Sequence, residues 1–275
     1  MNNPLAIETG LHWMAVMVYV LATLFTVYGV FFKKEKAERR SFYLAFAGLL
    51  IHGVAILYRW NIVGHGPYMA RYEVLSADAW ILMATFLITC RMFRVIRPLS
   101  VFIFPATFLI VALGLFCNPA INTLPPTFRS IWLILHVLFY KVATATIILA
   151  ATFSFLYILK TRSSKKWLER LPALDIIDVY AYRFAGFGFT FWAIAMLTGS
   201  IWAYQSWGRF WGWDPIETWS LITWIGFGLY LHLRRFFRLR GEVAAYFYIA
   251  CFIISLVAVF FLSFIDTSVH SEYFK

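Results

Sequence analysis

Charged residues and cysteines are both scarce in this sequence, and each shortage restricts what the protein can be. Charged side chains make up 13% of the 275 residues, whereas 62% are hydrophobic and 20% aromatic. A soluble domain carries more polar residues than this, so a water-soluble enzyme or binding module is excluded. Cys90, Cys117 and Cys251 have no paired spacing, which leaves a CxxC redox centre or a zinc site unsupported. We expect them to be small apolar packing residues, and any thiol chemistry to come from another protein.

Acidic residues are scarce as well: 13 Asp and Glu against 24 Lys and Arg give a formal net charge of +11. Such an excess can indicate nucleic-acid binding, but here the basic residues form short clusters between long apolar runs. That distribution is typical of the cytoplasmic loops of a polytopic membrane protein, and we expect no nucleic-acid partner. The N-terminal MNNPLAIETG has no basic region, so the first apolar run is expected to be a permanent span.

The apolar runs predict an all-α polytopic membrane protein with about eight transmembrane helices in a single domain, residues 1–275. The expected spans are residues 11–32, 41–60, 76–93, 98–117, 132–158, 182–204, 217–236 and 244–266. Pro98, Pro105 and Pro119 bracket or interrupt the fourth span, which favours a kink there. The amphipathic segment 163–183 is expected to lie along the cytoplasmic interface as a short helix.

The basic clusters predict how the bundle is oriented. Lys and Arg are dense in the connectors around residues 33–40, 91–97, 160–183 and 234–240. The opposite set of connectors and ends holds only Arg59, Arg71, Arg129, Arg209 and Lys275. By the positive-inside rule the first set is cytoplasmic. Both termini and the connector between spans six and seven are therefore expected on the outer side.

The segment of residues 202–224 between spans six and seven, WAYQSWGRFWGWDPIETWSLITW, is the most distinctive part of the chain. It contains six tryptophans: Trp202, Trp207, Trp211, Trp213, Trp219 and Trp224. An interfacial belt spreads its tryptophans over the ends of several helices, whereas these share one short segment. The concentration indicates a flat aromatic surface for a large, planar, apolar ligand, for which haem is the obvious candidate.

The end of this segment also predicts a helix start. Asp214, Pro215 and Glu217 occupy the positions of an N-cap, a proline at the first helical residue and a glutamate at the third. We expect the two acids to form a capping box that fixes where span seven begins. Their role is then mainly architectural, with acid–base catalysis as the minority alternative.

The histidines differ in their expected depth in the membrane. His136 lies about one turn into span five from the outer side, and His270 lies just beyond the outer end of span eight. Two neutral imidazoles at the level of the tryptophans are what a six-coordinate haem iron requires, so both are predicted iron ligands. The alternative for either is an interfacial histidine with its polar tip in water. His12, at the outer start of span one, is expected to be such a residue.

A second, deeper site could be formed by His232, near the cytoplasmic end of span seven, and His52, nearer the middle of span two. Their depths differ by on the order of 10 Å from the helical rise, which weakens the pairing. The alternative for His232 is snorkelling towards the neighbouring arginines. Lys141 is an unusual intramembrane charge and so marks a functional position.

The outer side supplies cations that could bind haem propionates, namely Arg59, Arg71 and Arg209. The connector RWNIVGHGPYMARYEVLSADAW after span two contains a glycine–proline turn signal. It adds further polar groups near the outer surface: His65, Tyr72 and Glu73.

The segment WGRFWGWDPIETWSLITWIGFGLYLHLR resembles the tryptophan-rich WWD signature of haem-handling cytochrome c biogenesis proteins. More narrowly, it resembles the CcsA (ResC) component of the system II cytochrome c synthase. The resemblance extends through LDIIDVYAYRFAGFGFTFWAIAMLTGSIWA, the RWNIVGHGPYMARYEVL connector, the histidine at the start of span five and VHSEY near the C-terminus. It is most specific between residues 174 and 234. The family often has lysine where this chain has Ile216, so no role for a cation is carried over there.

By position, the resemblance implies that His136 and His270 ligate the iron of haem b beside the WWD segment. It implies that His232 belongs to a transmembrane haem site whose second ligand comes from a CcsB (ResB) subunit, which makes His52 a weaker candidate ligand. The implied activity is haem delivery from the cytoplasmic side and attachment to the CxxCH cysteines of apocytochrome c, a synthase or lyase reaction. Thioredoxin-like thiol reductants are the other implied partners. The expected location is the bacterial cytoplasmic membrane, or the thylakoid membrane for a plastid protein.

A b-type haem subunit that only transfers electrons is the alternative reading. Such proteins place paired histidines at matched depths on facing helices inside the bundle. Here the better-matched pair is at the outer surface, and the tryptophan segment would have no purpose. A secondary transporter would be expected to show internal repeats, and we find no obvious one.

Overall fold

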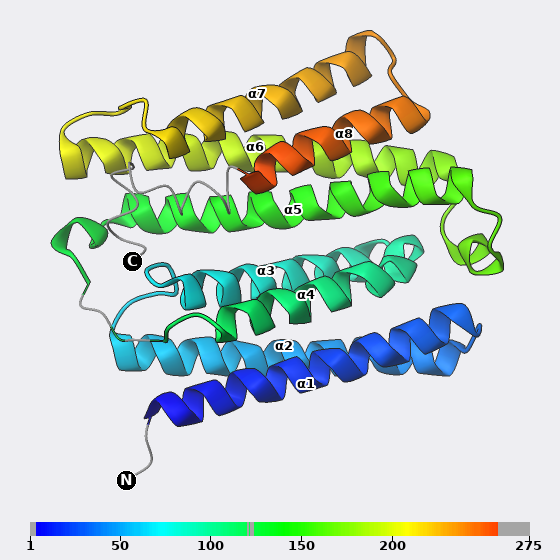
Figure 1. The fold of residues 1–275 in the computed structure, drawn as a ribbon, viewed down its shortest axis with the longest axis horizontal. Coiled ribbons are helices and arrows are strands. Elements are labelled where there is room, and N and C mark those ends of the chain that lie inside the picture. Colours follow the sequence, from blue (N-terminus) through cyan, green and yellow to red (C-terminus); the bar gives the residue numbers. More distant parts are fainter. Residues whose placement is uncertain (1–3, 120, 122–123, 258–275) are drawn as a thin grey trace. The chain divides into compact units, whose positions relative to one another are not determined.

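The computed structural model describes residues 4–119, 121 and 124–257, and in these ranges the protein is all-helical (Figure 1). The α-helices are α1 (Pro4–Phe31), α2 (Glu35–Val63), α3 (Arg71–Met92), α4 (Ser100–Leu115), α5 (Ile131–Arg162), α6 (Leu174–Trp207), α7 (Pro215–Phe236) and α8 (Gly241–Leu256). Three short 3₁₀ segments join them, η1 (Arg94–Leu99), η2 (Pro126–Phe128) and η3 (Lys166–Arg170). The prediction of an all-α polytopic membrane protein is confirmed. Six of the helical segments, α1 to α3, η1 with α4, α5 and α6, are long and apolar enough to cross a membrane.

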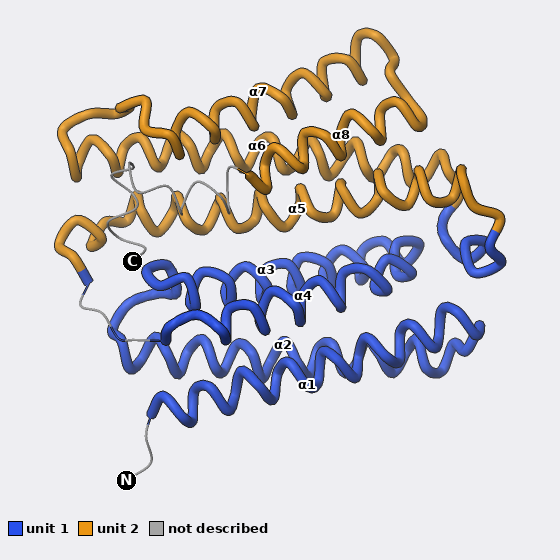
Figure 2. Tube along the Cα trace, viewed as in Figure 1, with its two compact units in different colours: residues 1–124, 165–172 blue, residues 125–164, 173–275 orange. Residues whose placement is uncertain are grey.

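The chain divides into two compact units (Figure 2). Unit 1 comprises residues 1–124 and 165–172, and in it α1 packs on α2 and α4 while α3 packs on α4. Unit 2 comprises residues 125–164 and 173–275, and in it α5 packs on α6 and α8 while α7 packs on α6 and α8. Within each unit successive helices run antiparallel, so the connectors alternate between its two ends (Figure 1).

Glycines in the left-handed conformation end the two helices that lead into the polar connectors. Gly64 follows α2 with φ 77° and donates its N–H to the Trp60 carbonyl. Gly208 follows α6 with φ 73° and donates to the Tyr204 carbonyl. A side chain is strained in this region of backbone space, which is why helices so often stop at glycine. Both connectors therefore leave their helices in a fixed direction.

Two segments differ in detail from the sequence expectations. Segment 163–183 does not form one interfacial helix: η3 ends at Arg170, and α6 begins only at Leu174. Pro172 lies between them, and a proline disfavours helix in the residue before it, so the helix has to restart. In the fourth span, α4 begins at Ser100, after a 3₁₀ segment that contains Pro98, while Pro105 is accommodated inside the helix.

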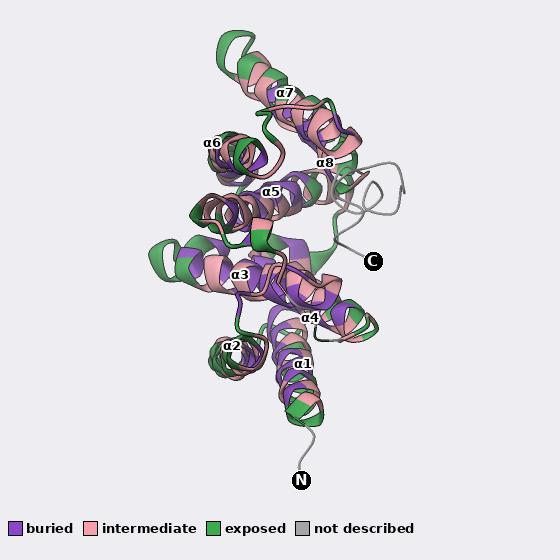
Figure 3. Cartoon of the chain, turned by 90° about the vertical axis from the view of Figure 1, so that its left-hand side faces the viewer, coloured by how far each residue is buried: buried purple, intermediate pink, exposed green. Residues whose placement is uncertain are grey.

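Burial follows the helix faces in both units (Figure 3). Figure 3 shows many buried residues on α3, whereas α2 is mostly intermediate or exposed. Large apolar side chains such as Leu24, Phe46 and Leu57 are exposed. On a soluble protein this would be a defect, but a membrane helix presents such a surface to lipid. Close approach inside unit 1 depends on glycine, because a Cβ at Gly29 would come 2.6 Å from the backbone nitrogen of Glu38.

Candidate functional site

The α6–α7 connector, residues 208–214, and the beginning of α5 lie at the same end of unit 2 (Figure 1). The capping box predicted for the connector is confirmed. The Asp214 carboxylate accepts a hydrogen bond from the Ile216 N–H at 2.8 Å. The Glu217 carboxylate accepts from the N–H groups of Gly212 at 2.8 Å and Asp214 at 3.2 Å. Two acids thus fix both the start of α7 and the backbone of the connector, as a capping box does.

The six tryptophans do not share one flat surface. Trp202, near the end of α6, is buried; its Nε1–H donates to the Thr127 carbonyl at 2.9 Å, and its ring meets the edge of Trp207 at 4.9 Å. Trp224, two turns into α7, stacks on Phe189 at 4.8 Å. These contacts are those of packing residues, in which the polar N–H finds a carbonyl partner. The aromatic surface is therefore smaller than the sequence suggests.

Trp211 and Trp213 remain as the aromatic side chains of the connector itself. Their ring centroids are 6.0 Å apart and the rings are nearly perpendicular, at 86°. Trp213 is 70% exposed and has φ 56°, in the left-handed region that non-glycine residues rarely adopt. The Nε1 of Trp211 is buried without a hydrogen-bond partner among the described residues. Backbone strain and an unsatisfied donor side by side are features that persist at functional sites.

His136 is held by a backbone carbonyl of α6. Its Nδ1 lies 2.7 Å from the carbonyl oxygen of Ala195, which can only accept, so Nδ1 carries the hydrogen. Nε2 of the neutral ring then carries the lone pair, which is the arrangement found in histidine ligands of metals. Gly199 makes the approach possible, because a Cβ there would lie 2.6 Å from Nδ1. The ring is also near that of Tyr140, with centroids 5.9 Å apart.

The remaining predicted residues of unit 2 are spread along its length. Lys141 is buried on α5, about a turn beyond His136. Arg209 is exposed in the connector and its guanidinium lies against Gly212. Trp219 is half-buried in the first turns of α7. His232 is exposed near the other end of α7, its ring 4.6 Å from that of Phe236. His270 falls outside the described residues.

Unit 1 contains polar side chains whose environment differs from the sequence expectation. Arg59 was expected to serve haem propionates, but it is buried and paired with Glu8 at 3.2 Å and Glu73 at 3.0 Å. His12 is not an interface residue either, because it is 1% exposed and hydrogen-bonded to Ser76. Both expectations are wrong for the same reason: these groups satisfy one another inside unit 1 instead of reaching water.

His52 also belongs to this buried set. Its Nε2 lies 2.9 Å from the Ser76 hydroxyl, and its Nδ1 lies 3.4 Å from the Tyr19 hydroxyl. Both ring nitrogens of His52 are thus engaged within the unit. The four-residue spacing of Glu8 and His12 was the available sequence signal for this set, because it places both on one helix face.

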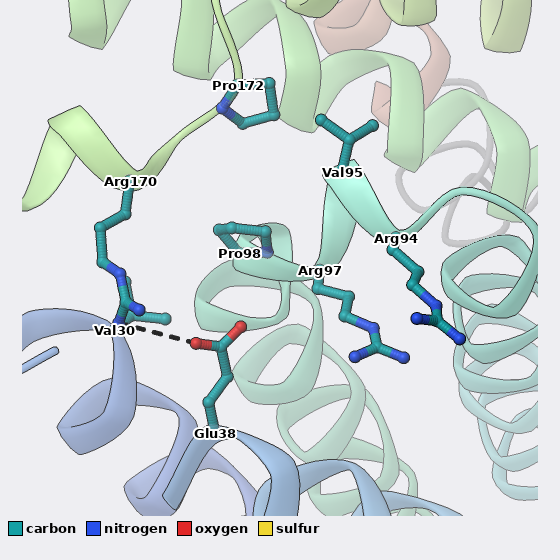
Figure 4. A pocket seen from close by; sticks show the side chains of 8 residues that line it. All are labelled: Val30, Glu38, Arg94, Val95, Arg97, Pro98, Arg170 and Pro172. Atoms are coloured by element: carbon teal, nitrogen blue, oxygen red, sulfur yellow. Dashed lines mark ion pairs between the residues drawn. The ribbon is translucent and has the colours of Figure 1, made fainter. Parts of the chain in front are cut away.

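A pocket of about 280 Å³ lies at the end of unit 1 where α1 and α2 join (Figure 4). Arg94, Arg97 and Arg170 line it together with Glu38. Arg170 is 3.7 Å from Glu38 and donates to the Gly29 carbonyl at 2.9 Å. The volume is below the range usual for cofactor pockets, and the contacts fasten the η3 segment to α1 and α2. We assign this pocket a structural role.

Comparison with known proteins identifies similar chains. Residues 68–270 match the family described as cytochrome C assembly protein. The CcsA cytochrome c biogenesis protein of Chlamydomonas reinhardtii is 34% identical over 197 residues, covering 69% of this chain and 56% of that protein. The protein of the same description from Prochlorococcus marinus strain MIT 9301 is 29% identical over 284 residues, covering 93% of this chain and 91% of the relative.

A solved structure is similar in fold. It is described as cytochrome c haem lyase CcmF and matches with a TM-score of 0.68 at 14% identity. The match covers 96% of this chain but only 50% of the CcmF chain. At that identity the likeness concerns the fold alone.

Proposed function

Because the chain belongs to the cytochrome c assembly protein family, we propose that it delivers haem to apocytochrome c and takes part in its covalent attachment. The haem is a substrate that enters from the cytoplasmic side and is used on the outer side of the membrane. The basic connectors support this orientation, with both termini and the α6–α7 connector outside. The bacterial cytoplasmic membrane, or the thylakoid membrane in a plastid, is the corresponding location.

The observation that carries the proposal is the tautomer of His136. The Ala195 carbonyl holds Nδ1–H at 2.7 Å, which directs the lone pair of Nε2 away from α6. His136 and His270 are the two proposed axial ligands of the haem iron. The exposed ring of Trp213 and its neighbour Trp211 would cover the macrocycle, while Trp202, Trp207 and Trp219 support the connector from the helices. Asp214 contributes through the cap that holds the connector in place.

The propionates require cations on the same side of the membrane. Arg209 is the proposed partner, because it is exposed in the connector beside the tryptophans. Lys141 is buried on α5 below His136 and would add positive charge beneath the site. Charge-assisted bonds of this kind orient a ligand as well as hold it.

Attachment then adds each cysteine thiol of the CxxCH motif across one haem vinyl group. The sulfur bonds to one vinyl carbon and the thiol hydrogen ends on the other, so the step needs no external oxidant. The chain's own contribution is to orient haem and peptide, which converts a bimolecular addition into a positioned one. The histidine of CxxCH would displace one protein imidazole and so release the product. The client thiols must be reduced, which calls for a thioredoxin-like partner.

His232 is the proposed ligand of a second haem position nearer the cytoplasmic end. His232 is exposed on α7, so a haem iron bound to it could take its second ligand from another polypeptide. A CcsB-like membrane subunit is the proposed source. Haem bound at this second position would lie on the path from the cytoplasm to the outer site.

The test is the absorption spectrum of the purified protein, expressed with a CcsB-like partner and compared in oxidised and reduced states. We expect a low-spin six-coordinate haem that is lost or weakened in His136→Ala and in His270→Ala. Added imidazole should restore the spectrum in both variants by replacing the missing ligand. His65→Gln is the matched control, because it removes a histidine from unit 1 that is not a proposed ligand.

Cytochrome c maturation should be measured on the same variants. Normal maturation in both His136→Ala and His270→Ala would exclude the outer-ligand proposal. If haem binding is unchanged in His136→Ala and His270→Ala but is lost when His52 and His232 are substituted, the electron-transfer alternative is indicated instead.

A further inference from the structure

Unit 1 contains a continuous chain of buried polar side chains that haem handling does not use. It runs through Tyr19, His52, Ser76, His12 and Tyr72 to Glu8, and every member is at most 3% exposed. The members come from α1, α2 and α3, which are brought together by the packing of the unit. Gly48 permits the contact at the inner end, because a Cβ there would lie 2.7 Å from the Tyr19 ring. Polar groups at such depth in a membrane protein are costly and call for a function.

Each link of the chain is within hydrogen-bonding distance. The Tyr19 hydroxyl lies 3.4 Å from His52 Nδ1, and His52 Nε2 lies 2.9 Å from the Ser76 hydroxyl. The same hydroxyl lies 2.9 Å from His12 Nε2, and His12 Nδ1 lies 2.9 Å from the Tyr72 hydroxyl. The Tyr72 hydroxyl also hydrogen-bonds to the Glu8 carboxylate. The serine is therefore a bridge between two imidazoles.

One contact fixes the direction of all the hydrogens. His12 Nδ1 lies 3.1 Å from the Glu8 backbone carbonyl, which can only accept, so Nδ1 carries a hydrogen. Nε2 of neutral His12 then accepts from Ser76, whose oxygen accepts from His52. The remaining nitrogen of His52 accepts from Tyr19, and Tyr72 donates to Glu8. Each hydrogen-bond donor in the chain therefore faces an acceptor. A proton can pass along the chain by successive transfers, in which each group accepts one proton and releases another.

The outer end of the chain has a deficit of positive charge. Among the described residues, Arg59 pairs with two carboxylates, Glu8 and Glu73. Both Glu73 oxygens are satisfied, one by Arg59 and the other by the N–H groups of Met69 at 3.1 Å and Ala70 at 3.3 Å. In contrast, Oε1 of the fully buried Glu8 has no hydrogen-bond partner among the described residues. If the imidazoles are neutral, Glu8, Glu73 and Arg59 together carry one excess negative charge in an apolar interior.

The neighbouring elements offer few other titratable groups. The α2–α3 connector contributes His65, whose Nδ1 lies 3.9 Å from Glu73, and the nearby Tyr68. Along Ser100–Leu115, α4 has no titratable side chain. The Pro119 carbonyl accepts from Arg59 at 2.7 Å. Of these groups, only His65 can become a cation, and only by taking up a proton. Because a buried charge has to be paired or neutralised, a proton has to enter this part of unit 1.

We propose that unit 1 contains a proton-binding relay: Glu8 takes up one proton on its carboxylate, and Tyr72, His12, Ser76 and His52 connect that carboxylate to Tyr19. Binding converts the carboxylate of Glu8 to a carboxylic acid with a proton from the outer aqueous side. The transfers inside the chain move protons only, with no change of oxidation state. The relay is a property of unit 1, separate from the haem residues of unit 2.

Infrared spectroscopy of the full-length protein in lipid nanodiscs tests the binding site. A protonated buried carboxylic acid has a carbonyl stretch resolved from amide bands, and we expect one in the wild type at neutral pH. It should be absent in Glu8→Gln and unchanged in Glu242→Gln, which removes a carboxylate of unit 2 outside this set. No such band in the wild type, or a band that survives Glu8→Gln, would overturn the assignment. Monodispersity in size-exclusion chromatography confirms that each variant is folded.

Exchange of the His52 imidazole N–H with solvent deuterium, followed by NMR of ¹⁵N-histidine, tests the relay. Although His52 is fully buried, we expect exchange through the chain, slowed about tenfold or more in Ser76→Ala. Ser41→Ala is the control, since Ser41 is a buried serine outside the chain whose hydroxyl donates to the Glu38 carbonyl. Tyr72→Phe breaks a different link and should slow exchange in the same way. Exchange that is unchanged in both Ser76→Ala and Tyr72→Phe would show that the chain does not conduct protons.

Discussion

Replacing Gly199 by alanine should disable the proposed haem site without unfolding the protein. The added Cβ would lie 2.6 Å from Nδ1, 2.9 Å from Cε1 and 3.3 Å from Cγ of His136. Ordinary contact begins near 3.4 Å, so the methyl group is too close to the ring by roughly 0.8 Å. The His136 ring has to move rather than the α6 backbone, because the backbone is held by the hydrogen bonds of the helix.

The estimated energies of Gly199→Ala indicate that the variant should lose function while staying folded. Displacing the ring weakens the bond to the Ala195 carbonyl, worth about 0.5–1.5 kcal/mol, and adds overpacking of about 1–3 kcal/mol. Alanine is favoured over glycine inside a helix by about 1 kcal/mol, which offsets part of this cost. The free energy of unfolding should therefore fall by no more than about 3.5 kcal/mol. Ligation is more sensitive, since a displacement of about 1 Å can reduce a positioned reaction about 10²-fold.

The assay combines cytochrome c maturation, the haem spectrum and thermal unfolding of Gly199→Ala. Gly186→Ala is the control, because Gly186 lies on the same helix and has nothing within 4 Å of its added Cβ. It should be at least as stable as the wild type and fully active. If Gly199→Ala bound haem and matured cytochrome c like Gly186→Ala, the placement of His136 against α6 would be irrelevant to the function.

Three further predictions concern charges and strain. Arg59→Ala leaves Glu8 and Glu73 buried without their cation and should lower the free energy of unfolding by about 3–5 kcal/mol. In the same denaturation assay, Arg162→Ala, which breaks an exposed pair with Glu242, should leave the unfolding midpoint nearly unchanged. Glu217→Gln weakens two bonds to the connector backbone, so limited proteolysis should cut residues 208–214 faster than in the wild type. Trp213→Gly removes a side chain held at φ 56° and should raise stability by about 0.5–1 kcal/mol while weakening haem binding, measured by haem titration.

Local features of the sequence predicted local features of the structure. The Asp214–Glu217 capping box formed as expected, because both of its bonds lie within four residues. The helices followed from apolar runs of sufficient length, and α4 starts irregularly where Pro98 removes a donor. Segment 163–183 was predicted wrongly as one helix, although Pro172 in the middle gave a signal against it.

Contacts between helices could not be predicted in the same way. The tryptophans share one segment of sequence, yet Trp202 and Trp224 pack inward while Trp213 is exposed, because helix phase decides where each ring points. Arg59 and His12 looked like surface residues from their depth. Their partners come from helices far along the chain, and no spacing rule indicates which polar groups will meet.

The sequence alone identifies an all-helical membrane protein of the cytochrome c assembly family, because length, apolarity and the WWD motif are properties of single segments. The folded structure is needed to show that the Ala195 carbonyl sets the tautomer of His136 and that Gly199 makes room for the ring. It alone joined Tyr19, His52, Ser76, His12, Tyr72 and Glu8 into one hydrogen-bonded chain. Hydrogen bonds act over about 3 Å, so such assignments depend on which helix faces meet, and helix packing is what places those faces together.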